Sequence, residues 1–248
     1  MHELAAASWT LFREALEQHD GALVRPSIPI LFFGDDEQYA RSPLKIVTVG
    51  LNPSRLEFPR QDPFLRFRAA RKVDPDRPDL DAHLAALRAY FWEQPYNAWF
   101  RPSFEPMLGG LDASYYAGAA STALHTDICS PLATDPTWSG LGRVGHALLP
   151  AGADLWHRLV ERLAPDVILI SVARRYLDLI RFPKLGAWET VYTIDRHNPF
   201  TVEALRMEIL PGKSTLLVFG RAANLPFGTV SAVDKRRIGA AIRSALLA

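Results

Sequence analysis

The segment DVILISVA, residues 166–173, constrains the fold of this chain more than any other. Residues 167–170 are all apolar, so a strand formed here presents an apolar surface on both faces. Such strands occupy the interior of parallel sheets, where helices cover both sides. The segment therefore predicts an α/β fold built around a buried sheet.

Strand and helix patterns alternate along the rest of the chain. Runs rich in β-branched residues predict strands, and apolar residues at helical spacing predict helices. The alternation predicts three layers, with a central, mostly parallel sheet flanked by helices. The expected strands are 29–36, 44–50, 121–129, 166–173, 188–195 and 214–220. The expected helices are 1–20, 79–94, 152–165, 174–182, 201–209 and 231–248, the last capped by Ser231.

Size and composition favour one domain. Of the 248 residues, 48% are hydrophobic, which suits one large α/β core. Because no linker or internal repeat is visible, we expect a single domain over residues 1–248, with an N-terminal helical extension over about residues 1–26. Residues 55–79 form a long, charged, proline-rich loop, and loops of this length are often functional.

Charge and cysteine content exclude several classes of protein. The formal net charge is +1, so any nucleic-acid contact must come from a local basic patch. The single cysteine, Cys129, excludes an intrachain disulfide framework and a metal site needing several cysteines. No apolar run has the length of a membrane span, and the N-terminus lacks a signal-peptide pattern. We expect a cytoplasmic monomer that does not associate with membranes.

The expected strand 44–50 ends abruptly in the sequence GLNPS, residues 50–54. One interpretation is an ordinary strand-to-helix corner, in which Gly50 supplies a tight turn, Pro53 ends the strand and Ser54 caps a helix. The other is a reactive site, because ligands of open α/β sheets bind beyond the carboxyl ends of the strands. No phosphate-binding Gly-Lys-Ser sequence follows.

VGLNPS resembles the first motif of the uracil-DNA glycosylase superfamily, especially its mismatch-specific and single-strand-selective branches, which have Gly-X-Asn-Pro after the first core strand. Three further patches follow in the family's order. HTDICSP resembles the end of the second core strand, and DVILISVARRYLDLI resembles the third strand and its helix. LLVFGRAANLPFGTVSAVDKRRIG resembles the last strand, second motif and final helix. The resemblance covers roughly residues 44–247 and implies the uracil-DNA glycosylase-like fold.

The resemblance implies roles for the first motif. Asn52 matches the residue that positions the attacking water, and an amide orients water without being a strong base. Backbone groups around Gly50, Leu51, Pro53 and Ser54 would bind the base. The family stacks an aromatic ring on the base about a dozen residues later, for which Phe64 is the first choice and Phe58 the alternative.

Asp127 stands where many relatives have an asparagine that reads the base. A carboxylate only accepts hydrogen bonds, so it suits an amino group, as on cytosine, or a modified base with an extra donor. An ionised Asp127 fits the O4 atom of uracil poorly. The alternative is a structural aspartate that caps a turn.

The second motif has two alternatives. Asn224 is preferred, because a basic helix follows it as in the family, and His197 in DRHNPF is the second choice. A wedge into the DNA would come from Leu225 or Phe227. Phosphate contacts are expected from basic residues, since the backbone of DNA is anionic. These are Arg66, Arg68, Lys235 and Arg236.

The resulting hypothesis is a monofunctional DNA glycosylase that binds DNA and releases a damaged, mismatched or modified base without a metal or cofactor. One alternative is a catalytically inactive member of the same fold that binds a nucleic acid or nucleotide. The other is an unrelated small-molecule hydrolase with a similar sheet and a closed pocket.

Overall fold

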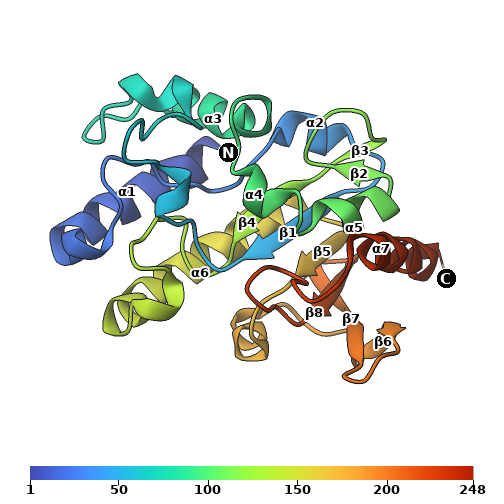
Figure 1. The fold of residues 1–248 in the computed structure, drawn as a ribbon. Coiled ribbons are helices and arrows are strands. Elements are labelled where there is room, and N and C mark those ends of the chain that lie inside the picture. Colours follow the sequence, from blue (N-terminus) through green and yellow to red (C-terminus); the bar gives the residue numbers. More distant parts are fainter. Residues whose placement is uncertain (248) are drawn as a thin grey trace. The chain divides into compact units, whose positions relative to one another are not determined.

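The computed structural model describes residues 1–247 and contains a six-stranded mixed sheet in the order β4-β1-β5-β8-β7-β6 (Figure 1). β1 pairs with β5 and β5 with β8 in parallel, whereas β7 is antiparallel to both β8 and β6. The strands are β1 Ile46–Gly50, β4 Leu124–Asp127, β5 Val167–Ile170, β6 Glu189–Ile194, β7 Phe200–Leu210 and β8 Lys213–Gly220, with a separate parallel pair, β2 Ala113–Ser114 and β3 Ser121–Thr122. The helices are α1 His2–His19, α2 Asp36–Arg41, α3 Leu80–Arg88, α4 Asn97–Phe100, α5 Glu105–Gly110, α6 Arg143–Leu163 and α7 Ala232–Leu247. The predicted α/β class, with a mostly parallel sheet and flanking helices, is confirmed.

β5 is the strand that the sequence places in the interior of the sheet, and the structure confirms this. All of its residues, Val167–Ile170, are fully buried. Each one pairs with β1 on one side and with β8 on the other. An apolar run without alternation is therefore explained by burial on both faces.

The helix predicted over 201–209 is wrong, because this segment belongs to the long strand β7. Its alanine, leucine, glutamate and methionine residues have high helix propensity, and pairing with β8 from Val202 to Leu210 overrides that preference. Leu210 pairs with Lys213 around a tight turn in which Gly212 has φ 76°. The Pro211-Gly212 turn was the sequence signal for a hairpin.

One smaller prediction also needs correction. The segment 29–36 is not a strand, since only Phe33 forms a bridge there, to His125. The segment after β5, where a helix is expected over 174–182, forms a 3₁₀ helix over Arg174–Leu179. The caps were predicted correctly: the Ser231 hydroxyl accepts a hydrogen bond from Asp234 N at 3.1 Å at the start of α7.

The chain divides into two compact units, which we describe separately. The first unit comprises Met1–Asp36, Leu51–Tyr96 and His125–Arg162. The second unit comprises Glu37–Gly50, Asn97–Leu124 and Leu163–Ala248. The single domain expected over 1–248 stays a prediction.

In the first unit, α1 contributes buried side chains to the core. Trp9 is buried, and its Nε1–H donates to Nδ1 of His83 at 3.2 Å. Nε2 of His83 bonds the carbonyl of Pro29 at 2.8 Å. Burial lowers the pKa of His83 to about 4, so this histidine is neutral and structural at pH 7.

In the second unit, α5 and α7 approach at paired glycines and lie side by side (Figure 1). A Cβ added to Gly239 would lie 2.1 Å from the carbonyl oxygen of Met107. A Cβ added to Gly110 would lie equally close, at 2.1 Å, to the carbonyl oxygen of Arg236. Only residues without a side chain allow the helix backbones to approach this closely.

Gly152 of α6 makes a similarly close backbone contact, in this case with the segment that follows β4. A Cβ there would lie 2.1 Å from the carbonyl oxygen of Cys129. Because the obstacle is backbone, no rotamer change relieves it, and we expect Gly152→Ala to lower the free energy of unfolding by about 1–3 kcal/mol. Urea denaturation measures this loss. Gly21→Ala is the control, since nothing lies within 4 Å of its added Cβ, and equal stability of the two variants would contradict the expected clash.

No helix among residues 1–247 combines the length and the apolar character that a membrane crossing requires.

Candidate functional site

The loop after β1 is held against the loop after β4. Cys129 N donates to the carbonyl of Leu51 at 2.8 Å, and Thr134 N donates to the carbonyl of Pro53 at 3.2 Å. The hydroxyl of Ser54 accepts from Leu56 N at 3.3 Å and caps a 3₁₀ helix, Arg55–Glu57. The corner predicted from GLNPS is therefore confirmed, and two backbone hydrogen bonds fix the position of the residue between them, Asn52.

The side-chain amide of Asn52 has a defined orientation. Its Nδ2 donates to the carbonyls of Pro53 at 2.7 Å and Leu132 at 3.3 Å, and to Oγ1 of Thr134 at 2.8 Å. Carbonyls only accept, and the Thr134 hydroxyl donates its hydrogen to Pro136 O at 2.8 Å. The nitrogen must therefore face these three groups. The carbonyl oxygen Oδ1 points away and receives no hydrogen bond from residues 1–247.

Asp127, the last residue of β4, is the second feature of the site. Its side chain is only 4% exposed, and Nε2 of the His125 imidazole lies 3.7 Å from Oδ1 of Asp127. Within the described residues, no N–H or O–H group donates a hydrogen bond to this carboxyl group. Buried carboxyl groups normally have such donors, so the carboxyl group of Asp127 is a candidate acceptor for a ligand.

Glu57 is a second buried carboxyl group, and the sequence patterns did not single it out. Its side chain is 8% exposed, and its Oε2 accepts a hydrogen bond from the Tyr90 hydroxyl at 2.5 Å. Arg66 Nε lies 3.9 Å from the same oxygen. Burial raises the pKa of Glu57 from 4.5 to about 7, and the negative charge of Asp127 acts in the same direction.

The aromatic residues near the motif separate into core and accessible rings. Phe58 is fully buried and stacks on Phe67, with ring centroids 5.2 Å apart and an interplanar angle of 21°. Phe64 contacts the edge of Phe58 at 6.3 Å and is partly exposed. Of the two alternatives for stacking on a base, Phe64 therefore has the free surface that the role requires.

The two arginines predicted to contact phosphate differ in their surroundings. The side chain of Arg66 is 15% exposed, and it donates to the carbonyls of Leu56 at 3.1 Å and Gln94 at 2.5 Å. Its guanidinium also lies over the ring of Tyr96 at 5.4 Å. Arg68 is exposed, and its backbone N–H, not its guanidinium, bonds Glu93 at 2.9 Å. Arg68 can reach a phosphate, whereas Arg66 holds the loop together.

The residues predicted for the second motif belong to the second unit. Asn224 and His197 are both exposed, the first in the loop after β8 and the second in the turn between β6 and β7. The choice between them stays open. Leu225 is partly exposed, and Phe227 is fully buried between Phe104 and Phe200, with ring centroids 5.9 and 6.1 Å away. Phe227 is a core residue in this structure and Leu225 keeps the surface that a wedge needs.

The two basic residues of α7 also differ. Lys235 is 3% exposed and donates to the carbonyls of Pro102 at 2.5 Å and Pro226 at 3.2 Å. Burial lowers its pKa to about 8. Arg236 is exposed and lines a shallow hollow of about 340 Å³ with Val233 and Arg237. Arg236 can therefore contact a phosphate, whereas the ammonium group of Lys235 already has partners inside the fold.

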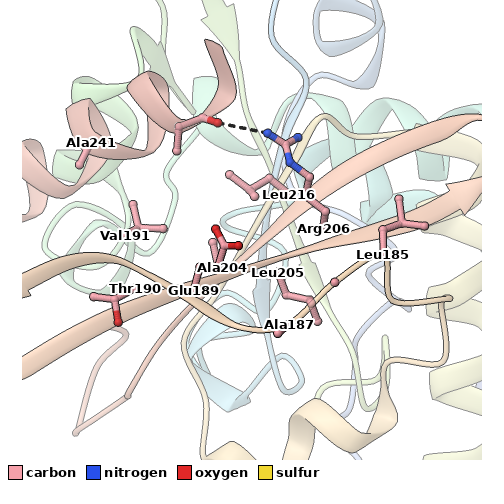
Figure 2. Close-up of a pocket in the computed structure, with 12 residues that line it drawn as sticks. Leu185, Ala187, Glu189, Thr190, Val191, Ala204, Leu205, Arg206, Leu216 and Ala241 are labelled. Atoms are coloured by element: carbon pink, nitrogen blue, oxygen red, sulfur yellow. Dashed lines mark hydrogen bonds between the residues drawn. The ribbon is translucent and has the colours of Figure 1, made fainter. Parts of the chain in front are cut away.

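A cavity of about 290 Å³ in the second unit has none of the predicted site residues in its lining (Figure 2). Residues 185–191, β7, β8 and α7 line it, and most of the side chains are small or apolar. Arg206, one of the lining residues, donates to the carbonyl of Ala245 at 3.2 Å. The side chain of Arg206 therefore holds α7 against β7.

The described residues contain no group of three histidine, cysteine, aspartate or glutamate side chains placed to hold a metal ion. Burial raises the pKa of the Cys129 thiol well above its usual range, and Asp127 adds to this effect, so Cys129 is a neutral buried side chain.

Comparison with known proteins finds no matching family model, no matching curated protein and no matching solved structure. The resemblance to uracil-DNA glycosylases rests on the sequence patches alone.

Proposed function

We propose that this protein is a monofunctional DNA glycosylase that hydrolyses the N-glycosidic bond of a damaged, mismatched or modified base. The observation that carries the proposal is the fixed amide of Asn52, whose nitrogen has three protein acceptors and whose carbonyl oxygen has no donor among residues 1–247. Such an oxygen accepts one O–H of a water molecule and orients the lone pair of that water.

The reaction needs this arrangement. A base inside a duplex must first be extruded from the stack. The bond between C1′ and the base nitrogen then breaks with its electron pair on the base, leaving a positively charged, oxocarbenium-like sugar. The oriented water forms the new C1′–O bond, and its proton finally neutralises the departing base, so one water is consumed and no cofactor is required. Positioning of the water is the contribution of Asn52.

Two further groups support a base-binding role. Asp127 offers a buried carboxyl group to which no described residue donates a hydrogen bond, and a nucleobase presents N–H groups that can bond to it. Phe64 offers a partly exposed ring, and ring stacking holds any base because every base has a π-face. Asn52, Asp127 and Phe64 all belong to the first unit.

A base-release assay tests the proposal. We would incubate the protein with oligonucleotides containing uracil, thymine opposite guanine, hypoxanthine and several modified cytosines, each single- and double-stranded. Alkaline cleavage at an abasic site is the expected result for at least one of them. Intact strands throughout the panel, at enzyme in excess over DNA, would contradict a glycosylase.

The second candidate is a member of the same fold that binds a nucleotide or nucleic acid without cleaving it. The engagement of Arg66 and Lys235 inside the fold favours it, because fewer cations remain for a DNA backbone. Base-dependent binding without base release would identify this alternative.

A further inference from the structure

The cavity of about 290 Å³ in the second unit lies where the chain leaves the edge of β7. On one side of this point, Leu185 N donates to the carbonyl of Arg206 at 2.8 Å. On the other side, Glu189 of β6 pairs with Ala204. Residues 186–188, between these two contacts, belong to no strand. The hollow is therefore formed by the path of the backbone at the sheet edge, and α7 contributes to its lining.

A carboxylate and a guanidinium line this cavity. Glu189 lies opposite Ala204, and Arg206 is two residues further along β7, so Glu189 and Arg206 are diagonal neighbours on the same face of the sheet. Such neighbours are about 7–8 Å apart, which is within reach of long side chains. Figure 2 shows both side chains pointing toward the side on which α7 lies. They nevertheless form no ion pair with each other in the described part of the chain.

Both charged groups keep hydrogen-bonding capacity. Nη2 of Arg206 donates to the carbonyl of Ala245 at 3.2 Å, which holds the guanidinium against α7. Its remaining N–H groups have no acceptor among residues 1–247, and Glu189 receives no side-chain hydrogen bond from these residues. A guanidinium only donates and an ionised carboxylate only accepts. The cavity thus offers a free donor and a free acceptor to a ligand.

The rest of the lining limits the kind of ligand. Apart from Thr190, the other lining residues are glycine or apolar; Leu216 lies opposite Arg206 on β8, and Ala241 and Ala245 belong to α7. The lining residues include no aromatic side chain, so a nucleobase would gain no stacking there. The volume of about 290 Å³ is at the small end of ligand pockets. These features favour a small aliphatic molecule.

We propose that this cavity binds a small aliphatic α-amino acid in its zwitterionic form. The ammonium group donates to Glu189, the carboxylate accepts from Arg206, and the aliphatic side chain contacts Leu216 and the alanines of α7. Because the lining has one positive and one negative side chain, a zwitterion matches it in charge. A ligand with a single charge leaves one of the two groups without a partner. The site does not depend on the proposed glycosylase activity.

Isothermal titration calorimetry of the full chain at pH 7 tests the site, with glycine, L-alanine, L-valine and L-leucine as probes. We expect at least one of them to bind with Kd below about 1 mM. Two analogues of that amino acid follow: the acid without the amino group and the amine without the carboxylate. For L-leucine these are 4-methylpentanoate and 3-methylbutylamine. Each should bind at least roughly tenfold more weakly, because each loses one hydrogen bond to a charged group.

Two variants connect the affinity to this cavity. Glu189→Ala should weaken binding of the amino acid at least roughly tenfold and leave the affinity for the analogue without the amino group within about twofold. Arg206→Met should weaken the amino acid similarly and leave the amine unaffected. Asp195→Ala removes an exposed acid that follows β6 and does not line the cavity, so this control should bind normally.

Thermal unfolding checks that the variants are folded. Glu189 has no side-chain partner among residues 1–247, so Glu189→Ala should stay folded even if Arg206→Met does not. Equal Kd values in Glu189→Ala and Asp195→Ala would overturn the proposal. So would an analogue that binds as tightly as its amino acid, or no binding of any of the four amino acids. None of these results bears on base release, which is measured separately.

Discussion

Asn52→Ala is expected to lower the rate of base release under single-turnover conditions by at least roughly 100-fold. The substitution removes the carbonyl oxygen that orients the water, while the backbone hydrogen bonds of Leu51 and Pro53 keep the loop in place. Because Asn52 contacts the water and not the base in this account, Kd for an uncleavable probe should change by less than about threefold. Rapid-quench sampling of strand cleavage measures the rate.

Two further variants control this result. Gln18→Ala removes an exposed amide from α1 and should leave the rate unchanged. Thr134→Val removes one of the three acceptors of Asn52 Nδ2 and should give an intermediate loss, because the amide is held less firmly. A rate for Asn52→Ala equal to that of Gln18→Ala would show that Asn52 does not position the water.

Glu57→Gln is expected to raise the free energy of unfolding, relative to that of the unsubstituted protein, by about 3 kcal/mol more at pH 8 than at pH 5. Glu57 has a pKa of about 7 in the folded protein and an ordinary value of 4.5 in the unfolded chain. Between these values the folded state holds more protons, so its stability falls as the pH rises from 4.5 to 7. Glutamine has no charge to bury, so the variant escapes this loss.

At each pH, the free energy of unfolding of the variant must be compared with that of the unsubstituted protein. Neutral, buried His83 has the opposite effect, because its pKa of about 4 lies below that of the unfolded chain and its contribution falls as the pH drops from 6.5 to 4. Urea denaturation at pH 5 and pH 8 gives both free energies. Glu93→Gln is the control, because the carboxyl group of Glu93 is less buried. If the difference in unfolding free energy between Glu57→Gln and the unsubstituted protein does not change with pH, Glu57 is not a buried acid with a raised pKa.

The elements that sequence patterns predicted correctly are those determined by local chemistry. The apolar run of β5 and the caps at Ser54 and Ser231 depend on the residue and its immediate neighbours. β7 was missed because its residues favour a helix locally. They form a strand only because they pair with β8, which follows β7 after a two-residue turn.

The candidate site was predicted in part for the same reason. The position of Asn52 follows from the motif, but two of the three acceptors that orient its amide come from residues some 80 positions later. Glu57 lies in a charged, proline-rich loop, and only its contact with Tyr90 identifies it as a buried acid. An acid between Leu56 and Phe58 was the one local sign of burial.

Mass-spectrometric detection of free base tests the central claim most directly. The panel oligonucleotides would be incubated with the unsubstituted protein and with Asn52→Ala, and the small molecules released would be identified by mass. Our account predicts a free nucleobase from at least one oligonucleotide, in an amount equal to the abasic sites formed, and little or none with Asn52→Ala. No free base from any oligonucleotide, or equal amounts from the two proteins, would contradict it.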